Sequence, residues 1–506
     1  GTRARTGTRA RTRTGPTTTR MMKKTTTRLA AVVLGFLIAA PVFADGSRDS
    51  ARLDEDLKLV ARLRSEGRDD MALTLASRIV AVNPTSLEAH LAYQDLRIAK
   101  GETAALVREY SKRQSGSDVT ADDVFLHARL LSSNRRAISG FKRALKLDPN
   151  HFPALCALGA RQVESGDLDG AGKNLALARR LRPESGVPVN LLGRAAEVRG
   201  DPGRAERLYR TAAKLAPTDP LPVLNLGVLL MGLERYDDAL PVLEEANRLD
   251  PTDPMPLLVL GMCFAARGDL ESAVAEYKEA VELPSNTVDS LNMLGSAYIG
   301  LEQFDLAKKA LDKALDAAPK SVPTLLNLCY LELRQNRVAE AAQWVKKARK
   351  LDPRSAQACY FAGLCEEFLG RQKAAEQAYR RAVTLDEGNP DYWRALGTFY
   401  SNLTRYRDAV KAYTKVVTLT DRSVPALTDL AFAWVGRGDP KKAITCFEEV
   451  IEAEPDNLTA WMNIGLIYQE KLSDRDQAIR AYQEYLKRGG EDERVKKWLE
   501  ELRAGK

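Results

Sequence analysis

Residues 217–250 read PTDPLPVLNLGVLLMGLERYDDALPVLEEANRLD, and the pattern of this stretch returns along the chain at a fixed step of 34 residues. A proline opens it at Pro217, and alanine follows at Ala239. Between them lies a small residue that recurs as Gly159, Gly193, Gly227, Gly261, Gly295, Cys329, Gly363, Gly397, Ala431 and Gly465. A period of this length indicates an array of structural repeats that stack into one continuous core.

Each repeat is predicted to contain two helices. Apolar residues cover a wide face of the first, at Leu221, Leu224, Leu226 and 228–230. After Gly232 a second helix shows the i, i+3, i+4, i+7 stripe at Tyr236, Ala239, Leu240, Leu243 and Ala246. Proline then ends the unit, because it lacks a backbone donor. The small residues are expected to let the two helices of a hairpin approach closely, with Gly or Ala facing Ala.

These positions resemble the tetratricopeptide repeat, whose pattern over 34 residues is Trp, Leu-Gly, Tyr, Ala, aromatic, Ala and Pro. The best matches in this chain are Trp393, Leu396, Gly397, Tyr400, Ala409 and Tyr413, then Trp461, Ile464, Gly465 and Tyr468. The resemblance implies an all-α fold, a right-handed α-solenoid. It also implies a non-catalytic protein that binds its partners in a groove lined by the first helices.

The period divides the chain into 13 helix-turn-helix units. The third lacks three residues, most simply from the turn around 132–134, and the last carries one extra residue near Ser473. A capping helix and tail, 493–506, are expected to shield the apolar face of the last unit. The predicted array 53–492 comprises units 53–86, 87–120, 121–151, 152–185, 186–219, 220–253, 254–287, 288–321, 322–355, 356–389, 390–423, 424–457 and 458–492.

The N-terminal segment has a different composition. Residues 1–20 are of low complexity and carry no acidic residue, and we interpret them as an extension of the gene model rather than a functional basic arm. Residues 21–44 have the charged, apolar and small-residue regions of a secretory signal peptide, with cleavage after Ala44. The apolar run is short for a permanent anchor, which is the alternative. No cysteine precedes Cys156, so a lipoprotein is not expected.

Removal of this segment changes the charge of the chain. The full sequence has 76 basic and 68 acidic residues. Nine basic residues and no acidic residue precede Asp45, so the mature chain would have 67 and 68, a net charge of −1. A basic surface for nucleic acid is therefore not expected.

The sequence offers no recognisable catalytic or metal-binding motif. Its three histidines, His90, His127 and His151, occupy unrelated positions of the repeat without a partner at metal-ligand spacing. We interpret them as structural or surface residues and expect no enzyme activity, cofactor or metal. The six cysteines form no Cys-x-x-Cys motif and are expected to be buried free thiols. The alternative is a disulfide, for which Cys329 and Cys365 in adjacent units are the best pair.

In the family that this chain resembles, the second, fifth, ninth and twelfth residues of the first helix face the groove. Carried over, these positions hold apolar residues and almost no charge in several units, which favours an apolar protein partner. We expected the centre of contact at Leu224, Leu258 and Met262. The candidate partner-binding residues are Leu221, Leu224, Val228, Met231, Met255, Leu258, Met262, Leu326, Tyr330, Tyr360 and Leu364.

The leading functional hypothesis is an exported, periplasmic or secreted, scaffold that binds apolar or extended protein segments during cell-envelope assembly or secretion. No nucleic acid is expected as a partner, and no membrane span should remain after signal cleavage. One alternative is an accessory subunit of an enzyme complex, for glycosyl transfer or cytochrome maturation. Another is a cytoplasmic adaptor whose N-terminus only resembles a signal, which would suit the free cysteines.

Overall fold

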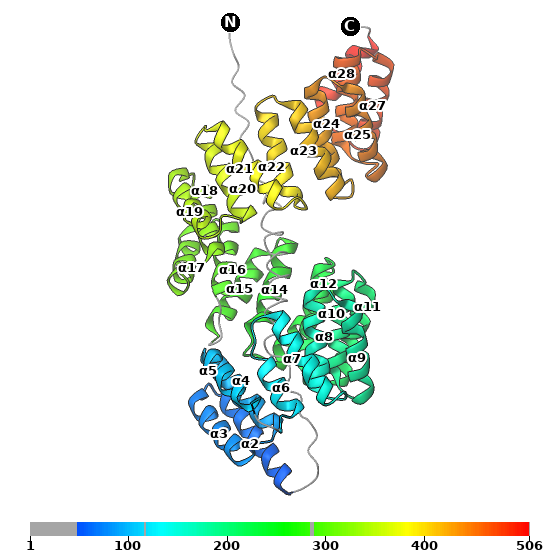
Figure 1. The fold of residues 1–506 in the computed structure, drawn as a ribbon. Helices are drawn as coiled ribbons and strands as arrows, with labels where there is room; N and C mark the ends of the chain where they lie inside the picture. The colour runs from blue at the N-terminus through cyan, green and yellow to red at the C-terminus, as the bar shows by residue number, and fades with distance from the viewer. Residues whose placement is uncertain (1–47, 116–117, 284–287, 505–506) are drawn as a thin grey trace. The chain divides into compact units, whose positions relative to one another are not determined.

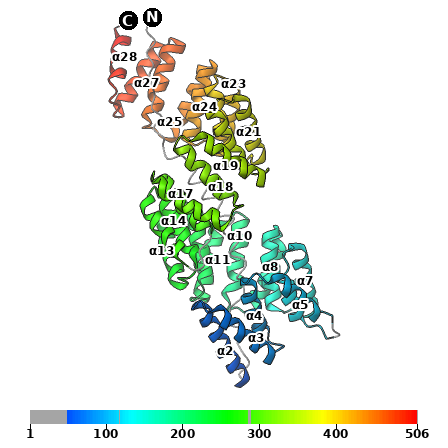
Figure 2. The same ribbon diagram turned by 90° about the vertical axis from the view of Figure 1, so that its left-hand side faces the viewer.

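The computed structural model describes residues 48–115, 118–283 and 288–504, and all ordered elements in these ranges are helices. The predicted signal peptide and the segment before it lie outside the described residues. The chain divides into two compact units, here called the N-terminal part (48–297) and the C-terminal part (298–504). Within each part, consecutive helices pack as antiparallel neighbours (Figures 1 and 2). The prediction of an all-α helical repeat array is confirmed.

The helices of the N-terminal part alternate between first and second helices of successive hairpins. They are α2 Arg48–Ser65, α3 Asp69–Val82, α4 Leu87–Ala99, α5 Thr103–Arg113, α6 Ala121–Ala128, α7 Asn134–Leu147, α8 Phe152–Ser165, α9 Leu168–Leu181, α10 Gly186–Val198, α11 Pro202–Leu215, α12 Pro220–Gly232, α13 Tyr236–Leu249, α14 Pro254–Arg267 and α15 Leu270–Glu282. Helix α16 (Val288–Gly300) spans the boundary between the parts.

The C-terminal part continues the alternation and ends in an additional helix. Its elements are α17 Phe304–Ala317, α18 Val322–Arg334, α19 Val338–Leu351, α20 Ala356–Phe368, α21 Gln372–Leu385, α22 Pro390–Asn402, α23 Tyr406–Leu419, α24 Val424–Arg437, α25 Pro440–Ala453, α26 Leu458–Ile467, the π-helical segment η2 Tyr468–Leu472, α27 Arg475–Lys487 and α28 Glu493–Arg503.

The small residues at the helix crossings have a different neighbour from the one we expected. A Cβ added to Gly261 would lie 2.5 Å from the ring of Tyr277, and one added to Gly397 would lie 2.8 Å from the ring of Tyr413. The glycine therefore faces the side chain sixteen residues later, a large one, and not an alanine. The recurring alanine is nevertheless essential to the packing, since Ala171, Ala205, Ala239, Ala273, Ala307, Ala341, Ala375, Ala409 and Ala443 are all 0% exposed.

Two units differ in length from 34 residues, and in each the difference falls within a helix rather than in a turn. The extra residue of the last unit produces the π-helical segment η2, and Ser473 follows it with a φ of 52°. A π-turn holds one more residue than an α-turn, so the insertion is absorbed without loss of the hairpin. In the third unit, α6 ends at Ala128 after only 8 residues. The shortening thus falls on the first helix rather than on the turn where we placed it.

The terminal helix α28 covers the end of the array. Val495 and Leu499 are buried, and Trp498 and Leu502 pack beside them against Tyr482 of α27. The opposite face of α28 carries Lys and Glu side chains, as a solvent-facing cap requires. Within the described ranges, no helix has the length and apolar character needed to cross a bilayer.

Candidate partner-binding surface

The predicted binding residues lie on the first helices of four hairpins, α12, α14, α18 and α20. Side-chain caps determine where two of these helices begin. Asp219 accepts a hydrogen bond from the backbone N–H of Leu221 at 3.0 Å, and Asp253 accepts one from Met255 at 2.9 Å. Proline follows each cap, where its missing N–H costs nothing. The recurring Asp-Pro therefore places the predicted residues on equivalent helix faces.

Five members of the predicted set are buried in this structure. Leu224, Leu258 and Met262, which we expected at the centre of contact, are 1%, 0% and 2% exposed. Met231 and Leu326 are also buried. The six that stay half-buried are Leu221, Val228, Met255, Tyr330, Tyr360 and Leu364.

Polar contacts elsewhere in the array explain why the fifth residue of the unit is buried in α12, α14 and α18. Asn225 Nδ2 donates to Oδ1 of Asn190 at 3.0 Å, which joins the fifth residue of one unit to the sixth residue of the next. Arg394 and Asp429 repeat this relation at 3.1 Å. The fifth residue therefore packs between consecutive first helices. Leu224, Leu258 and Leu326 occupy the same place in their units.

Tyr360 is the centre of an aromatic cluster in the C-terminal part. Its ring centroid lies 5.3 Å from that of Phe361, 6.3 Å from Tyr379 and 5.4 Å from Tyr392. Burial raises the pKa of the Tyr360 hydroxyl well above its ordinary value. These contacts join α20, α21 and α22, so Tyr360 stabilises the stack and exposes only part of its ring.

In the C-terminal part, the ninth residue of each unit is at least partly accessible to solvent. We call Tyr330, Leu364, Thr398, Phe432 and Leu466 the ninth-position row. None of the five is fully buried, and Thr398 and Phe432 are exposed. Phe432 is 48% exposed, and its ring rests edge-on against the buried Phe447 at a centroid distance of 5.6 Å. Phe368, one helical turn after Leu364, extends the apolar surface and is 65% exposed.

Of this row, only Tyr330 and Leu364 belong to the residues predicted from the sequence. Phe432 is not among them, because that prediction rests on units without charge at the groove positions rather than on one position followed through all units. Its place as the ninth residue of unit 424–457 was the available signal. Phe368 is the thirteenth residue of its unit, outside the positions that we considered.

The corresponding position is polar near the start of the array. Asp95 and Arg129 are the ninth residues of their units, and Arg129 Nη2 donates to Asp95 Oδ1 at 2.6 Å. Arg129 also donates to the side chain of Gln94 at 3.0 Å. This ion pair bridges α4 and the residue that follows α6. The ninth position therefore joins neighbouring units there and offers no apolar surface.

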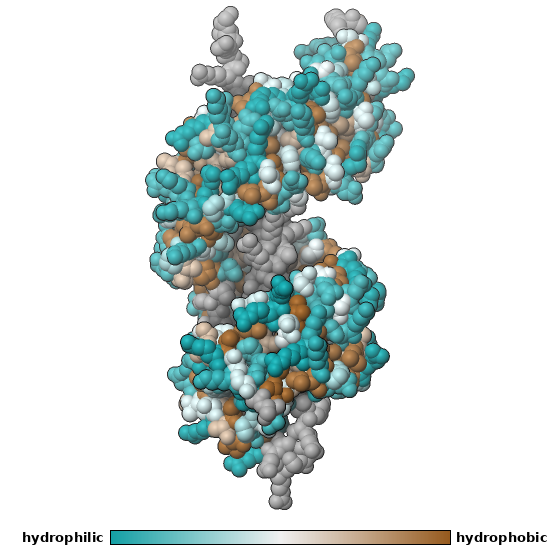
Figure 3. Space-filling view, viewed as in Figure 1, coloured by the Kyte–Doolittle hydropathy of each residue, from teal (hydrophilic) through white to brown (hydrophobic). Residues whose placement is uncertain are grey.

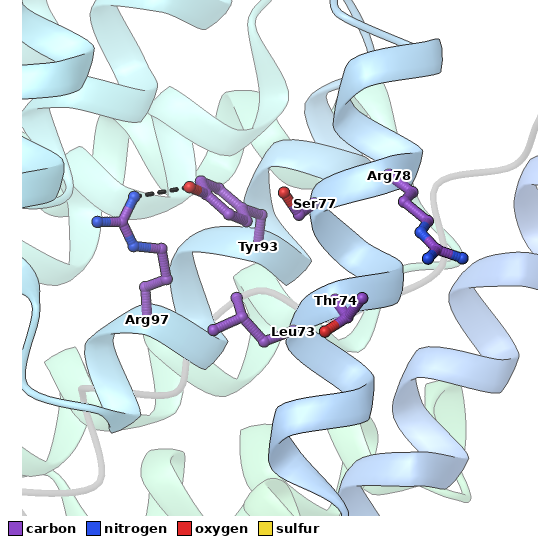
Figure 4. A pocket seen from close by; sticks show the side chains of 6 residues that line it. All are labelled: Leu73, Thr74, Ser77, Arg78, Tyr93 and Arg97. Atoms are coloured by element: carbon purple, nitrogen blue, oxygen red, sulfur yellow. Dashed lines mark hydrogen bonds between the residues drawn. The ribbon is translucent and has the colours of Figure 1, made fainter.

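A depression of about 460 Å³ between α3 and α4 is also polar (Figure 4). Arg97 crosses its edge and donates to the hydroxyl of Tyr93 at 2.6 Å. The same guanidinium donates to Glu102 and Glu109, so its charge is neutralised within the protein. We find no ligand chemistry in this depression, whose lining is Leu73, Thr74, Ser77, Arg78, Tyr93 and Arg97.

Two of the three histidines make structural contacts. His90 is buried, and its two ring nitrogens contact the Tyr110 hydroxyl at 2.7 Å and the carbonyl of Pro84 at 3.0 Å. His151 caps α8 by accepting from Ala154 N–H. Among the described residues, no three His, Cys, Asp or Glu side chains come together as metal ligands.

The outer surface is mainly hydrophilic on the face drawn in Figure 3, with apolar patches between the charged side chains. Exposed leucines also occur at the ends of second helices, for example Leu351 at 43% and Leu419 at 38%. Exposure of a single apolar side chain is thus common in this protein. Such leucines also recur, since Leu147, Leu181 and Leu215 end three consecutive second helices. The ninth-position row differs because it lies on first helices and contains the aromatic side chains Tyr330 and Phe432.

Comparison with known proteins identifies the repeat. Models described as tetratricopeptide repeat match residues 190–254, 224–286, 292–356, 356–389 and 428–493. A search of curated protein sequences finds no significant match.

Among solved structures, the chain is similar to the crystal structure of the MamA protein, with 27% identity and a TM-score of 0.29 over 33% of this chain and 92% of that one. It is also similar to the APC/C hetero-tetramer Cut9–Hcn1, with 12% identity and a TM-score of 0.40 over 90% and 96%. The human IFIT1 dimer with PPP-AAAA has 16% identity and a TM-score of 0.44 over 77% and 95%.

Proposed function

Because the chain belongs to the tetratricopeptide repeat family, we propose that it is a non-catalytic scaffold that binds protein segments along the ninth-position row. The observation that carries this proposal is the repeated, partly exposed apolar position on α18, α20, α24 and α26. A single exposed apolar residue needs no explanation, but an apolar ninth residue on four of the five first helices from α18 to α26 favours an extended partner. Phe432 is its most exposed apolar member.

The partner that fits this surface is a segment with apolar side chains at intervals. Covering the exposed half of the Phe432 ring would contribute roughly 1 kcal/mol, so several members of the row must act together to give useful affinity. Phe432 is already supported by the buried Phe447, which limits the freedom that its ring loses on binding. An aromatic anchor of this kind is typical of binding hot spots.

We propose further that the protein is exported and acts in cell-envelope assembly or secretion. The support is the sequence of 21–44, where Lys23, Lys24 and Arg28 precede an apolar run that ends in small residues before Ala44. N-terminal sequencing of the native protein tests export directly. A mature start at Asp45 is the expected result, and an intact Met21 or Met22 in the soluble fraction would contradict it.

Site-specific photocrosslinking tests the surface. A photoreactive phenylalanine analogue at Phe432 should crosslink to a partner in native cells, and mass spectrometry should identify an apolar segment at the crosslink. The same analogue at Leu351 is the matched control, because this side chain has similar exposure but lies at the end of a second helix. Equal labelling of the same partner from both positions would contradict the proposed surface.

The identity of the crosslinked partner also separates the two functional readings. An envelope or secretion component supports the assembly scaffold, whereas an enzyme bound in a constant ratio would make this chain an accessory subunit. Phe432→Ser should weaken partner binding about ten-fold, the loss of roughly 1.4 kcal/mol expected for an aromatic anchor. Its circular dichroism should remain that of the parent protein, because the ring is half exposed.

A further inference from the structure

Two cysteines in adjacent units approach each other inside the C-terminal part. Cys329 lies on α18 and Cys365 on α20, and both are buried. Their Sγ atoms are 3.9 Å apart, although the residues are separated by 36 positions. All six cysteines of the chain are buried free thiols in this structure. This pair is distinguished by direct contact between sulfur atoms.

Local packing explains how Cys329 reaches its neighbour. It occupies the position that is glycine in most units, where a glycine faces the residue sixteen places later. At Gly363 an added Cβ would be 2.6 Å from the ring of Tyr379. In the unit of Cys329 the equivalent residue is Val345, which has no ring. The smaller side chain leaves room for a thiol at the crossing, and that thiol contacts the next first helix.

The contact also changes the acidity of the pair. Burial raises the pKa of the Cys263 thiol to about 12 and that of Cys446 to about 11, which makes them poor nucleophiles. A hydrogen bond from the Cys329 thiol lowers the pKa of Cys365 instead. The pair therefore loses its first proton more readily than a lone buried thiol does.

We propose that Cys329 and Cys365 form a disulfide that joins α18 to α20 when the protein folds under oxidising conditions. On oxidation the two sulfur atoms would move from 3.9 Å to bonding distance, about 2.05 Å. The bond would fix the two helices that carry Tyr330 and Leu364, each adjacent in sequence to one of the cysteines. The proposal rests on the geometry of the pair; its use in the cell rests on the proposed export.

The reaction is a thiol–disulfide exchange with a disulfide-bearing oxidant. The Cys365 thiolate attacks one sulfur of the oxidant, which releases one oxidant thiolate and leaves a mixed disulfide on Cys365. The Cys329 sulfur then attacks Sγ of Cys365 and displaces the second oxidant thiolate. Two protein thiols lose two protons and two electrons, and one oxidant disulfide becomes two thiols. Because both thiols are buried, exchange takes place while this part of the chain is folding or opened.

The test is refolding of the chain from residue 45 onward in oxidised glutathione, followed by alkylation and peptide mapping without reduction. We expect a linked peptide pair containing Cys329 and Cys365, with the other four thiols alkylated. Cys365→Ala should abolish the link, whereas Cys156→Ala should retain it. Free thiols at both positions, or a link to any other cysteine, would overturn the proposal.

Hydrogen exchange provides a second measurement that does not depend on the variants. After oxidation, amide exchange in α18 and α20 should slow by roughly ten-fold or more, because the cross-link removes conformations of the open state. Exchange in α8 and α9 should not change. Unchanged exchange in α18 and α20 of the fully linked protein would contradict a stabilising bond. Neither measurement involves a partner protein, so a negative result leaves the proposed binding surface untouched.

Discussion

The ninth residue of the repeat has opposite roles near the two ends of the array. In the N-terminal part, Asp95 and Arg129 use it to form an ion pair between neighbouring units. In the C-terminal part, Phe432 occupies the same place and leaves 48% of its surface in solvent. The units differ in other respects as well, since α6 has only 8 residues and the ninth residue Met262 is buried. The comparison shows that the ninth residue need not be apolar, so its side chain can contact either the neighbouring unit or a partner.

Deletion of residues 491–506 should have the largest effect on stability, and it should affect the C-terminal part without affecting the N-terminal part. It removes the buried Val495 and Leu499 and uncovers Tyr482, a loss of roughly 3–6 kcal/mol in local stability. Hydrogen exchange should become faster in α26 and α27 and remain unchanged in α4 to α7, because repeats contact only their neighbours. An equal increase in exchange along the whole chain would show that the parts do not open independently.

Arg129→Met tests whether the N-terminal ninth position is structural. The change leaves Asp95 without its closest cation in a partly buried site, and we expect about 2 kcal/mol of destabilisation in thermal or denaturant unfolding. Adding Asp95→Leu should recover part of this loss, because the unpaired carboxylate is then removed. Thr398→Ser, at the exposed ninth position of the C-terminal part, is the control and should be nearly neutral, because serine keeps the hydroxyl that lies 3.0 Å from the Tyr413 hydroxyl. Similar losses in both single variants would remove the contrast between the parts.

Gly261→Ala and Gly397→Ala change the small residue at the helix crossing, once in each part, and should lower stability by similar amounts. Each new methyl group would approach a tyrosine ring, of Tyr277 or Tyr413, to within 3 Å. Overpacking should exceed the gain in helix propensity and cost about 1–2 kcal/mol in either variant. Unfolding monitored by circular dichroism measures both. An increase in the free energy of unfolding of either variant would mean that the tyrosine ring moves away without losing packing contacts.

Thr404→Gly should produce the smallest change, and it should be favourable. Thr404 has a φ of 58°, in the left-handed region, where seven equivalent turn positions, Gly370 among them, have glycine. A β-branched residue is strained there, so we expect a gain of about 0.5–1 kcal/mol in the free energy of unfolding. Gly370→Thr is the reciprocal control and should lose a similar amount. A loss of stability in Thr404→Gly would show that the threonine side chain contributes more than the strain costs.

Within individual units, the sequence predicted the capping helix and the inserted residue correctly, but it did not predict which groove positions are exposed. The capping helix predicted at 493–506 is present as α28, and its buried residues are Val495 and Leu499. The insertion near Ser473 was recognised from the period, but its conversion into a π-turn was not. Leu258 and Met262 were assigned to the surface and are buried. Periodicity identifies equivalent positions, but it does not measure how much of each remains exposed.

What the sequence determined by itself is the hairpin array. Proline, small residues and apolar stripes recur every 34 residues. Each of these patterns depends on residues within one hairpin, so it predicts the helices without information about the neighbouring units. Tertiary structure alone decided which groove positions remain open and how closely the Sγ atoms of Cys329 and Cys365 approach each other. These properties depend on how one hairpin stacks on the next. The contacts that set the stacking join residues about 35 positions apart, and no single unit contains both partners.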